Sequence, residues 1–495
     1  MNWRQLVAAL KQAGVRYDLE RLEIAYRFAY HVHEGQVRYN GEAYISHPVA
    51  VAGILGSWRQ PQGVVEAGLL HDCLKNSTVT YEQLKREFGL EIADLVSGVA
   101  KVGNVRLRGS AQGNFIENLR KMFVAMAADI RVVIIRLADR MHNMDTLDAV
   151  PLAKQKRIAL ETLEIYAPLA ERLGMGQVKG ALEDSAFPYA YPAEHKWLSE
   201  IANPHFATAA RTTQKLIKDI QLALKQASIE AQVHGRPKRR YSLYRKLQRP
   251  EIDRDISKIH DLIALRILTK TTMDCYAALG IVHNYWKPVP HIGISDFIAQ
   301  PKPNGYRSIH TKVFDHRGQI IEIQIRTYQM HEEAEYGAAA HFAYAEAKAG
   351  GATDASLEAG TAFSWDKKMA WVKQLAEWQH DVSDSEEFVS AIKLDALSSR
   401  IYVFSPRGDV FDLPSGATPV DFAYAIHTDF LSYIQGAKVN DKVVPLDFQL
   451  KSGDIVQILK TKNSRYPTHD WLRFVKTHRA RAVINKLLKQ RQADL

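Results

Sequence analysis

The spacing of apolar residues changes along this chain at about residue 230, and the change separates two kinds of secondary structure. Before that point apolar residues recur three and four positions apart, as in residues 22–32 and 92–99, which is the period of one face of an α-helix. From 230 to 345, short strand-like segments such as 319–326 alternate with helical ones such as 272–284. The sequence therefore predicts an all-helical first domain and a mixed α/β second domain.

The last third of the chain changes character again. Residues 346–362 contain adjacent glycines and few bulky apolar residues, which is typical of a flexible linker, and a short tryptophan-bearing helix is expected near 365–378. Residues 401–459 alternate in close-set strands around one helix-like stretch, which predicts a small β-rich module. We expect five parts: 1–195, 196–345, a linker and helix at 346–395, 396–462, and a basic helical end at 463–495.

Charge and cysteine content narrow the class of partner and compartment. The chain has 65 Lys+Arg against 55 Asp+Glu, a net charge of +10, which favours anionic partners such as nucleotides, RNA or a membrane surface. Its two cysteines, Cys73 and Cys275, cannot form a disulfide framework, so a reducing cytoplasm is expected. No apolar run of about 18 residues is present to span a bilayer, and acidic residues near the start argue against a signal peptide.

Positive charge is concentrated at the start of the second domain, in a segment without any acidic residue. Its cations are Arg236, Lys238, Arg239, Arg240, Arg245, Lys246 and Arg249. Such cations repel one another unless an anion lies among them. A solvated helix face is one interpretation. The interleaved Tyr241, Ser242 and Tyr244 favour a nucleotide site instead, because they supply ring faces and a hydroxyl donor.

Residues 319–326 predict a strand with two different faces, because side chains alternate in direction along a strand. The isoleucines at 321, 323 and 325 would face the core, and Glu322, Gln324 and Arg326 would share the other face. That second row carries a carboxylate, an amide and a cation, which are groups suited to a polar ligand.

A second apolar strand begins at Asp261 and runs past Arg266. A carboxylate from each strand, Asp261 and Glu322, could therefore hold Mg²⁺ between oxygen ligands. Strict alternation places Asp261 and Arg266 on opposite faces, so a bulge or the strand end is needed if both serve one site. Two surface carboxylates on edge strands are the alternative.

The helical first domain contains residue types that bind divalent transition metals: His47, His71, Asp72 and Asp139. Taken singly, each is also an ordinary core or capping residue. Asp139 and Asn143 are four residues apart and share one helix face, and His71-Asp72 is expected in another helix.

Five segments in order along the chain, 236–249, 260–266, 301–310, 321–327 and 331–337, closely resemble the synthetase domain of Rel/SpoT-type alarmone enzymes. The resemblance implies a nucleotidyltransferase-like fold and a GTP pyrophosphokinase of the stringent response, which moves pyrophosphate from ATP to the ribose 3′-hydroxyl of GTP or GDP and releases AMP. It implies that ATP is held by Arg236, Lys238, Ser242, Lys246, Arg249 and Arg266.

The same resemblance implies the catalytic pair and the acceptor side. Asp261 and Glu322 would bind Mg²⁺, and Glu322 would also accept or orient the 3′-hydroxyl proton. The GTP side would be lined by Lys302, Tyr306, His310 and Gln324, with Tyr306 stacked on the guanine. Where family members usually carry a charged tetrad ending in Asp, residues 293–296 read Gly-Ile-Ser-Asp, which leaves the preference between GTP and GDP open.

The first domain resembles the HD hydrolase domain that precedes the synthetase in this family. The resemblance implies that His47, His71, Asp72 and Asp139 are metal ligands, for Mn²⁺, and that Arg38 and Asn143 contact the substrate. The family's hydrolases place a Glu-Asp pair after the His-Asp, whereas this chain has Lys75-Asn76.

Lys75 would bring a cation near any bound metal, and the carboxylates that would ready a water are missing. We therefore expect a degenerate HD domain without hydrolysis, with a bifunctional synthetase and hydrolase as the alternative.

Residues 401–459 resemble a TGS module, a small β-grasp-like fold. The resemblance implies contact with the 3′ end of uncharged tRNA through His427, and a His427 that only caps its helix is the alternative. Long family members continue into further domains that help dock on ribosomes, so the ribosome is a further expected partner. The basic end suits RNA phosphate or plain solvation, and its cations are Arg473, Lys476, Arg479, Arg481, Lys486, Lys489 and Arg491. A non-catalytic tRNA-sensing protein is a further alternative, against which the set Asp261, Glu322 and Tyr306 argues.

Overall fold

The computed structural model describes residues 1–75, 78–103, 125, 128–259, 262–290, 294–302, 304–316, 318–337, 339–340, 400–426, 434–461 and 467–493. The chain forms two compact units, one of residues 1–108 with 121–365 and one of residues 109–120 with 366–495. The expected linker at 346–362 and the expected tryptophan-bearing helix at 365–378 lie outside the described residues. No described helix combines the length and the hydropathy that a membrane span requires.

The N-terminal part of the first unit is helical, as predicted, apart from an isolated bridge between Val37 and Ala43. Its described α-helices are α1 (Trp3–Gln12), α2 (Leu19–Val32), α3 (Ser46–Ser57), α4 (Gln62–Leu70), α5 (Tyr81–Phe88), α6 (Leu90–Gly103), α8 (Ile130–Asp145), α9 (Leu152–Glu161), α10 (Ala167–Arg172) and α11 (Gly176–Ala190). A 3₁₀ helix, η1 (Leu147–Ala149), and a π-helix, η2 (Thr162–Tyr166), lie between them. Helix α3 is buried along most of its length and packs against α1, α4 and α8. The central position of α3 explains why nearly all of its residues are small or apolar.

The rest of the first unit is a mixed sheet with helices. Its elements are α12 (Pro192–Gln226), β1 (Ala231–Pro237), α13 (Arg240–Leu247), η3 (Ile256–Lys258), β2 (Ile263–Thr269), α14 (Thr272–Tyr285), β3 (Ser295–Asp296), β4 (Ile309–Phe314), β5 (Ile320–Thr327) and α15 (Tyr328–Tyr336). The strand order is β1-β2-β5-β4-β3. Only the β2–β5 pair in this sheet is parallel.

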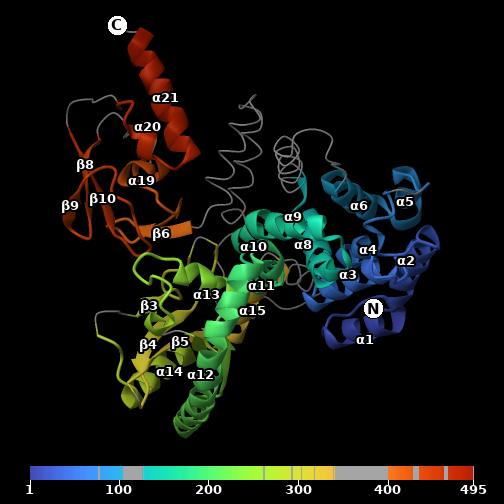
Figure 1. Cartoon of the computed structure of the whole chain (residues 1–495), viewed down its shortest axis with the longest axis horizontal. Coiled ribbons are helices and arrows are strands. Elements are labelled where there is room, and N and C mark those ends of the chain that lie inside the picture. Colours follow the sequence, from blue (N-terminus) through green and yellow to red (C-terminus); the bar gives the residue numbers. More distant parts are fainter. Residues whose placement is uncertain are drawn as a thin grey trace. The chain divides into compact units, whose positions relative to one another are not determined.

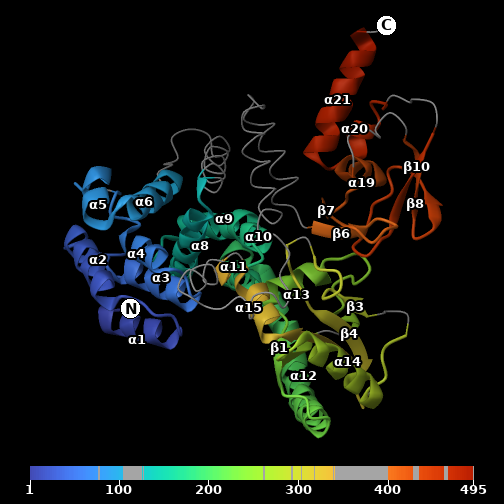
Figure 2. The same cartoon turned by 180° about the vertical axis from the view of Figure 1, so that it is seen from behind.

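The two faces of this sheet differ as the alternation predicted. Ile321, Ile323 and Ile325 are buried in a core with residues of α12 and α14, so those helices cover one face. Glu322 and Gln324 lie on the other face and are half-buried, and Arg326 on that face is fully buried. Helix α11 of the helical part packs against α13 and α15 (Figures 1 and 2). Since α15 also packs against β2 and β5, the helical part lies next to a helix that contacts these strands.

The second unit is a small β-rich module, also as predicted. It contains the hairpin β6 (Arg400–Phe404) and β7 (Val410–Pro414), helix α19 (Pro419–Ile426), the sheet β10-β8-β9 of β8 (Ile434–Val439), β9 (Lys442–Val444) and β10 (Val456–Lys460), and helices α20 (Trp471–Phe474) and α21 (His478–Ala493). Asp421 is fully buried and accepts backbone hydrogen bonds from Thr418 (2.9 Å) and Thr477 (2.7 Å). That carboxylate ties α21 to the module, and their shared apolar core makes the basic helix part of one folded body.

Candidate active site

A cavity of about 210 Å³ opens on the polar face of the five-stranded sheet. Its lining residues come from the end of β1, the start of α13, and strands β2 and β5: Arg236, Lys238, Arg239, Ser242, Ala264, Glu322 and Gln324. The register explains the assembly, because Arg236 pairs with Ala264 across β1 and β2, and β2 runs parallel to β5. Three predicted ATP-binding residues, Arg236, Lys238 and Ser242, thus share one cavity with Glu322.

The other predicted ATP-binding residues lie outside this lining. Arg249 is exposed beyond the end of α13 and Lys246 is half-buried on that helix. Arg266 is 5% exposed and pairs with Gln324 across β2 and β5, so it lies one step along the same face. Asp261 lies outside the described residues, two positions before β2 begins at Ile263.

The predicted acceptor residues form a chain of polar contacts that ends on Glu322. The Tyr306 hydroxyl is 2.8 Å from His310 Nε2, and His310 Nδ1 is 3.4 Å from Glu322 Oε1. Gln324 Nε2 donates to the same Glu322 oxygen at 3.0 Å. An Nδ1–H donor toward Glu322 leaves His310 Nε2 to accept from the Tyr306 hydroxyl, so one tautomer satisfies both contacts.

Lys302 completes this side of the site. Its ammonium lies 4.5 Å from the ring centre of Phe297 and 5.0 Å from that of Tyr306, which are distances of a cation–π contact. Burial lowers the pKa of Lys302 from its usual value. The ring of Tyr306 is therefore already covered by cations in this state, since the guanidinium carbon of Arg326 is 6.0 Å from its centre as well.

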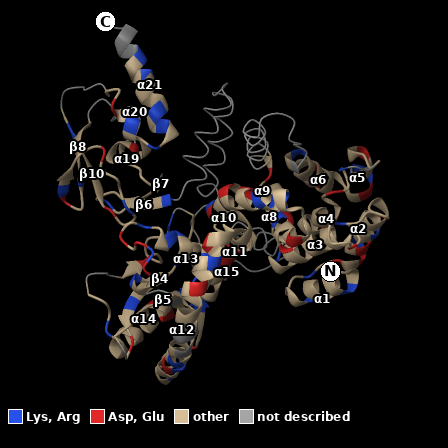
Figure 3. Ribbon diagram, viewed as in Figure 1, with Lys and Arg blue, Asp and Glu red and all other residues tan. Residues whose placement is uncertain are grey.

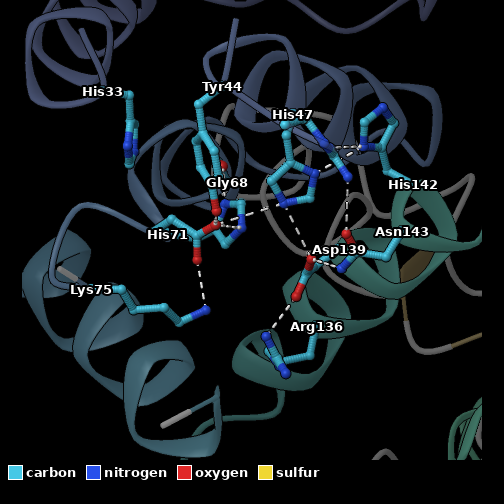
Figure 4. Close-up of polar contacts among 12 residues, drawn as sticks. His33, Tyr44, His47, Gly68, His71, Lys75, Arg136, Asp139, His142 and Asn143 are labelled. Carbon is cyan, nitrogen blue, oxygen red and sulfur yellow. Dashed lines mark hydrogen bonds and ion pairs between the residues drawn. The ribbon is translucent and has the colours of Figure 1, made fainter. Parts of the chain in front are cut away.

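A second polar centre lies in the helical part of the same unit (Figure 4). Ligand atoms of His47 on α3, His71 after α4 and Asp139 on α8 lie within 4.8 Å of one another, and all three residues are buried. His47 Nε2 is 3.3 Å from Asp139 Oδ1 and 3.7 Å from Asp72 Oδ2. All four predicted metal-ligand residues are therefore brought together.

The prediction that His71-Asp72 lies within a helix is wrong. Helix α4 ends at Leu70, His71 is its capping residue, and Asp72 lies in the following turn. His71 Nδ1 contacts the Gly68 carbonyl at 2.8 Å, and carbonyls at a helix end need such donors. Because a carbonyl can only accept, His71 Nδ1 carries the proton. Its Nε2 faces the centre and lies 3.3 Å from Asp72 Oδ2.

Lys75 lies in this centre as predicted, but its contact is with a ligand residue. Its ammonium is 2.6 Å from Asp72 Oδ1, and the Tyr44 hydroxyl donates to Asp72 Oδ2 at 2.7 Å (Figure 4). Burial alone would raise the pKa of Asp72, but the charges of His71 and Lys75 hold it well below its usual value. Both Asp72 oxygens thus have protein donors, and the ligand atoms that lie within 4.8 Å of one another belong to His47, His71 and Asp139. Asn76 lies outside the described residues.

The predicted substrate contacts of the HD domain lie at the mouth of the same centre. Arg38 Nη2 donates to Asn143 Oδ1 at 3.3 Å and to Thr146 Oγ1 at 2.9 Å, and Asn143 donates to Asp139 at 2.6 Å. Both Arg38 and Asn143 line a cavity of about 820 Å³ that also contains Lys75 and Asp139.

Sequence reasoning missed several residues that shape the two centres. Arg136 is 2.5 Å from Asp139 Oδ2, and its position three residues earlier on α8 was an available signal. Arg239, expected only as one cation of the basic segment, lines the cavity on the polar face of the sheet. Glu335 binds two arginines of the polar face; it lies in segment 331–337 of the resemblance, which implied no role for it.

In the small module, the predicted tRNA contact His427 lies outside the described residues. Residues 471–493 contain no Asp or Glu, and lysine and arginine recur along α21 (Figure 3). Exposed cations of α20 and α21 include Arg473, Arg479, Lys486 and Lys489.

Comparison with known proteins defines the class of the chain. Models of three families match in order: an HD domain at residues 25–176, the region found in RelA / SpoT proteins at 235–349, and a TGS domain at 401–460. The protein is thus a multidomain chain with a helical HD domain, an α/β synthetase-type domain and a TGS domain, which confirms the predicted fold class.

Relatives that match nearly the whole of this chain define its family. The chain is 45% identical over 483 residues to a GTP pyrophosphokinase of Myxococcus xanthus, covering 96% of this chain and 61% of the relative. It is 42% identical over 482 residues to a GTP pyrophosphokinase of Streptomyces coelicolor (96% and 56%), and 40% identical over 477 residues to the bifunctional (p)ppGpp synthase/hydrolase SpoT of Escherichia coli (96% and 66%). The chain belongs to the Rel/SpoT family, and it spans less than two thirds of the length of these relatives.

Proposed function

We propose that this chain is a (p)ppGpp synthetase, a GTP pyrophosphokinase that transfers pyrophosphate from ATP to the 3′-hydroxyl of GTP or GDP. The observation that carries the proposal is the position of Glu322. Its carboxylate lines the same cavity as Arg236, Lys238 and Ser242. It is also 3.4 Å from His310, one of the residues proposed to bind the acceptor nucleotide. A group at that junction can reach both the transferred phosphate and the attacking hydroxyl.

The proposed roles follow from the chemistry of phosphoryl transfer, which depends on positioning and on charge stabilisation. Cations around the cavity would hold the ATP phosphates. Glu322, with Asp261, would hold Mg²⁺, which accepts one or two protein carboxylates and completes its shell with phosphate oxygens and water. Bound there, Mg²⁺ would neutralise developing charge on the phosphates. Glu322 would orient the 3′-hydroxyl, and Lys302, Tyr306, His310 and Gln324 would bind the guanine nucleotide.

We further propose that the HD domain does not hydrolyse (p)ppGpp. Support comes from the ion pair between Lys75 and Asp72 at 2.6 Å, because the ammonium of Lys75 already neutralises the carboxylate of this candidate metal ligand. A metal bound to the other three ligands would lie next to that ammonium, and the repulsion would weaken its affinity. The residue pair Lys75-Asn76 also supplies no carboxylate to ready a water.

A bifunctional synthetase and hydrolase is the second candidate function. The observation that favours it is the convergence of His47, His71 and Asp139 within 4.8 Å, because three ligands and an open position are a common catalytic metal site. Mn²⁺-dependent release of pyrophosphate from ppGpp by the unmodified protein would establish this second function. It would refute the proposal that the HD domain does not hydrolyse (p)ppGpp.

For the small module we propose binding of the 3′ end of uncharged tRNA, with His427 as a contact, and for the whole protein we propose the ribosome as a further partner. The acid-free stretch at residues 471–493 supports an RNA partner, because phosphates require cations. We also propose a cytoplasmic location, which suits two buried cysteines that form no disulfide. The proposed domain boundaries are 1–195, 196–345, 346–395, 396–462 and 463–495.

The direct test is incubation of the purified chain with ATP, GTP and Mg²⁺, followed by separation of the nucleotides. The proposal expects pppGpp and AMP in equal amounts, and expects ppGpp when GDP replaces GTP. A protein that consumes neither nucleotide under these conditions, with and without uncharged tRNA and ribosomes, would refute the synthetase function.

A further inference from the structure

Two arginines on the polar face of the sheet are held by one carboxylate oxygen. Arg266 on β2 and Arg326 on β5 are diagonal neighbours, because Leu268, two residues after Arg266, pairs with Arg326. Helix α15 follows β5 directly and brings Glu335 over this face. Glu335 Oε1 is 2.9 Å from Arg326 Nη2 and 3.1 Å from Arg266 Nη2. The single oxygen therefore fixes the distance between the two guanidinium groups.

The cluster is buried and carries an excess of positive charge. Arg326 is 1% exposed, Arg266 5% and Glu335 9%, so two guanidinium groups face one carboxylate. His331 supplies no negative charge to the cluster. Its Nδ1 is 2.8 Å from Arg326 Nη2 and accepts a hydrogen bond from that arginine. Burial and the two arginine charges lower the pKa of His331 to about 4, which keeps its ring neutral.

A buried, uncompensated cation is costly unless an anion lies beside it. Burial and the charge of Arg326 lower the pKa of Arg266 to about 10, which shows that its positive charge is disfavoured at this position. Among the described residues, Arg266 Nε, Arg266 Nη2 and Arg326 Nε have no hydrogen-bond partner, so the contact of Arg266 with Glu335 is an ion pair. These donors and the excess charge indicate that an anion completes the cluster.

The surroundings of the cluster join the two sides of the proposed reaction. Arg266 lies beside Ala264 and Gln324, which line the cavity of the donor side. Arg326 lies under the ring of Tyr306 on the acceptor side, with 6.0 Å between its guanidinium carbon and the ring centre. One carboxylate oxygen is thus shared by an arginine of each side.

We propose that Glu335 is a positioning residue, which sets the donor polyphosphate against the acceptor nucleoside by holding Arg266 and Arg326 on one oxygen. The inference rests on the proposed synthetase function. Pyrophosphate transfer needs the attacking hydroxyl in line with the transferred phosphate, and small displacements are costly in rate. Glu335 acts on turnover through the two arginines and need not touch either nucleotide.

The test is steady-state kinetics of Glu335→Gln with ATP and GTP. The amide keeps the shape of the side chain but leaves two adjacent guanidinium groups without their shared anion. Positive charge for ATP is retained, so we expect kcat to fall at least tenfold while KM for ATP stays the same or falls. Loss of a merely structural contact would instead raise KM or lower the folded fraction, and it would not lower kcat while leaving KM for ATP unchanged.

Glu332→Gln is the matched control, because Glu332 lies on the same helix and pairs at 2.8 Å with Arg59 of the helical part. Its kcat should stay within twofold of the unmodified protein. If Glu335→Gln does not fold, Arg326→Lys carries the test, since it keeps the charge and removes the guanidinium fork; the same kcat loss is expected.

Folded Glu335→Gln or Arg326→Lys protein with unchanged kcat, or with KM for ATP raised at constant kcat, would overturn the inference and leave the synthetase function standing. An unmodified protein without product would overturn both.

Discussion

Replacement of Lys75 by methionine tests whether this side chain takes the place of a metal ion in the HD domain. Methionine keeps the length of the chain and removes the ammonium that lies 2.6 Å from Asp72. The Asp72 side chain is 6% exposed and that of Lys75 22%, so the change leaves a buried carboxylate with the Tyr44 hydroxyl as its main donor.

The size of the effect follows from that burial. Removing one partner of a buried ion pair costs about 3–5 kcal/mol, and the partial exposure of Lys75 favours the lower end, about 3 kcal/mol. A divalent ion about 5 Å from an ammonium is repelled by roughly 7 kcal/mol at a dielectric constant of about 20. Even half of that repulsion weakens a metal Kd by more than about a hundredfold. The variant should therefore be less stable without metal and should bind metal far more tightly.

Thermal unfolding with a chelator and with Mn²⁺ measures both effects. We expect Lys75→Met to unfold at a lower temperature in the chelator and to recover most of the loss in Mn²⁺, because a ligand at about 100 times its Kd returns about 2.7 kcal/mol. The unmodified protein should show little Mn²⁺ response. Lys154→Met is the control, since Lys154 lines the same cavity but pairs with the Tyr39 hydroxyl at 3.0 Å. An unmodified protein that binds Mn²⁺ as tightly as Lys75→Met would show that Lys75 does not weaken metal binding.

Three further predictions concern other parts of the chain. Glu322→Gln and Asp261→Asn should each remove most synthetase turnover with little change in unfolding temperature, because charge stabilised by a metal is worth several kcal/mol in the transition state; near-normal product formation would exclude that residue. His427→Ala should weaken tRNA binding or tRNA activation and leave tRNA-independent synthesis unchanged, and an equal tRNA response would make His427 a structural residue. Because the pKa of His331 is about 4 when folded and about 6.5 when unfolded, the unfolded chain binds more protons in that interval and stability falls as pH drops through it. His331→Asn keeps an acceptor without titrating, so its urea midpoint should fall less between pH 7 and pH 5; identical pH slopes would contradict this.

The sequence predicts best those features that depend on local periodicity. The period-two pattern around Glu322 placed the carboxylate and Gln324 on the polar face, and the structure confirms it. The helical spacing of Asp139 and Asn143 likewise becomes a hydrogen bond of 2.6 Å. In both cases the backbone geometry of one element decides which side chains share a face.

Features that depend on how elements end and pack were not predictable in the same way. The sequence placed His71 and Asp72 inside a helix, but α4 ends at Leu70 because the chain turns there and the His71 ring caps the helix end. Lys75 was expected to repel a metal, and its ion pair with Asp72 arises in that turn. The role of Glu335 depends on where α15 packs, which no local pattern encodes.

In the proposed reaction, pyrophosphate moves as a unit from ATP to the 3′-hydroxyl of a guanine nucleotide at the face that carries Glu322. Incubation of the chain with γ-labelled ATP, GTP and Mg²⁺ tests this claim most directly, with 3′-deoxy-GTP as the acceptor control. We expect one label transferred to the guanine nucleotide for each unlabelled AMP released, and no transfer to 3′-deoxy-GTP. Label recovered only as phosphate or pyrophosphate, with GTP unchanged, would contradict it.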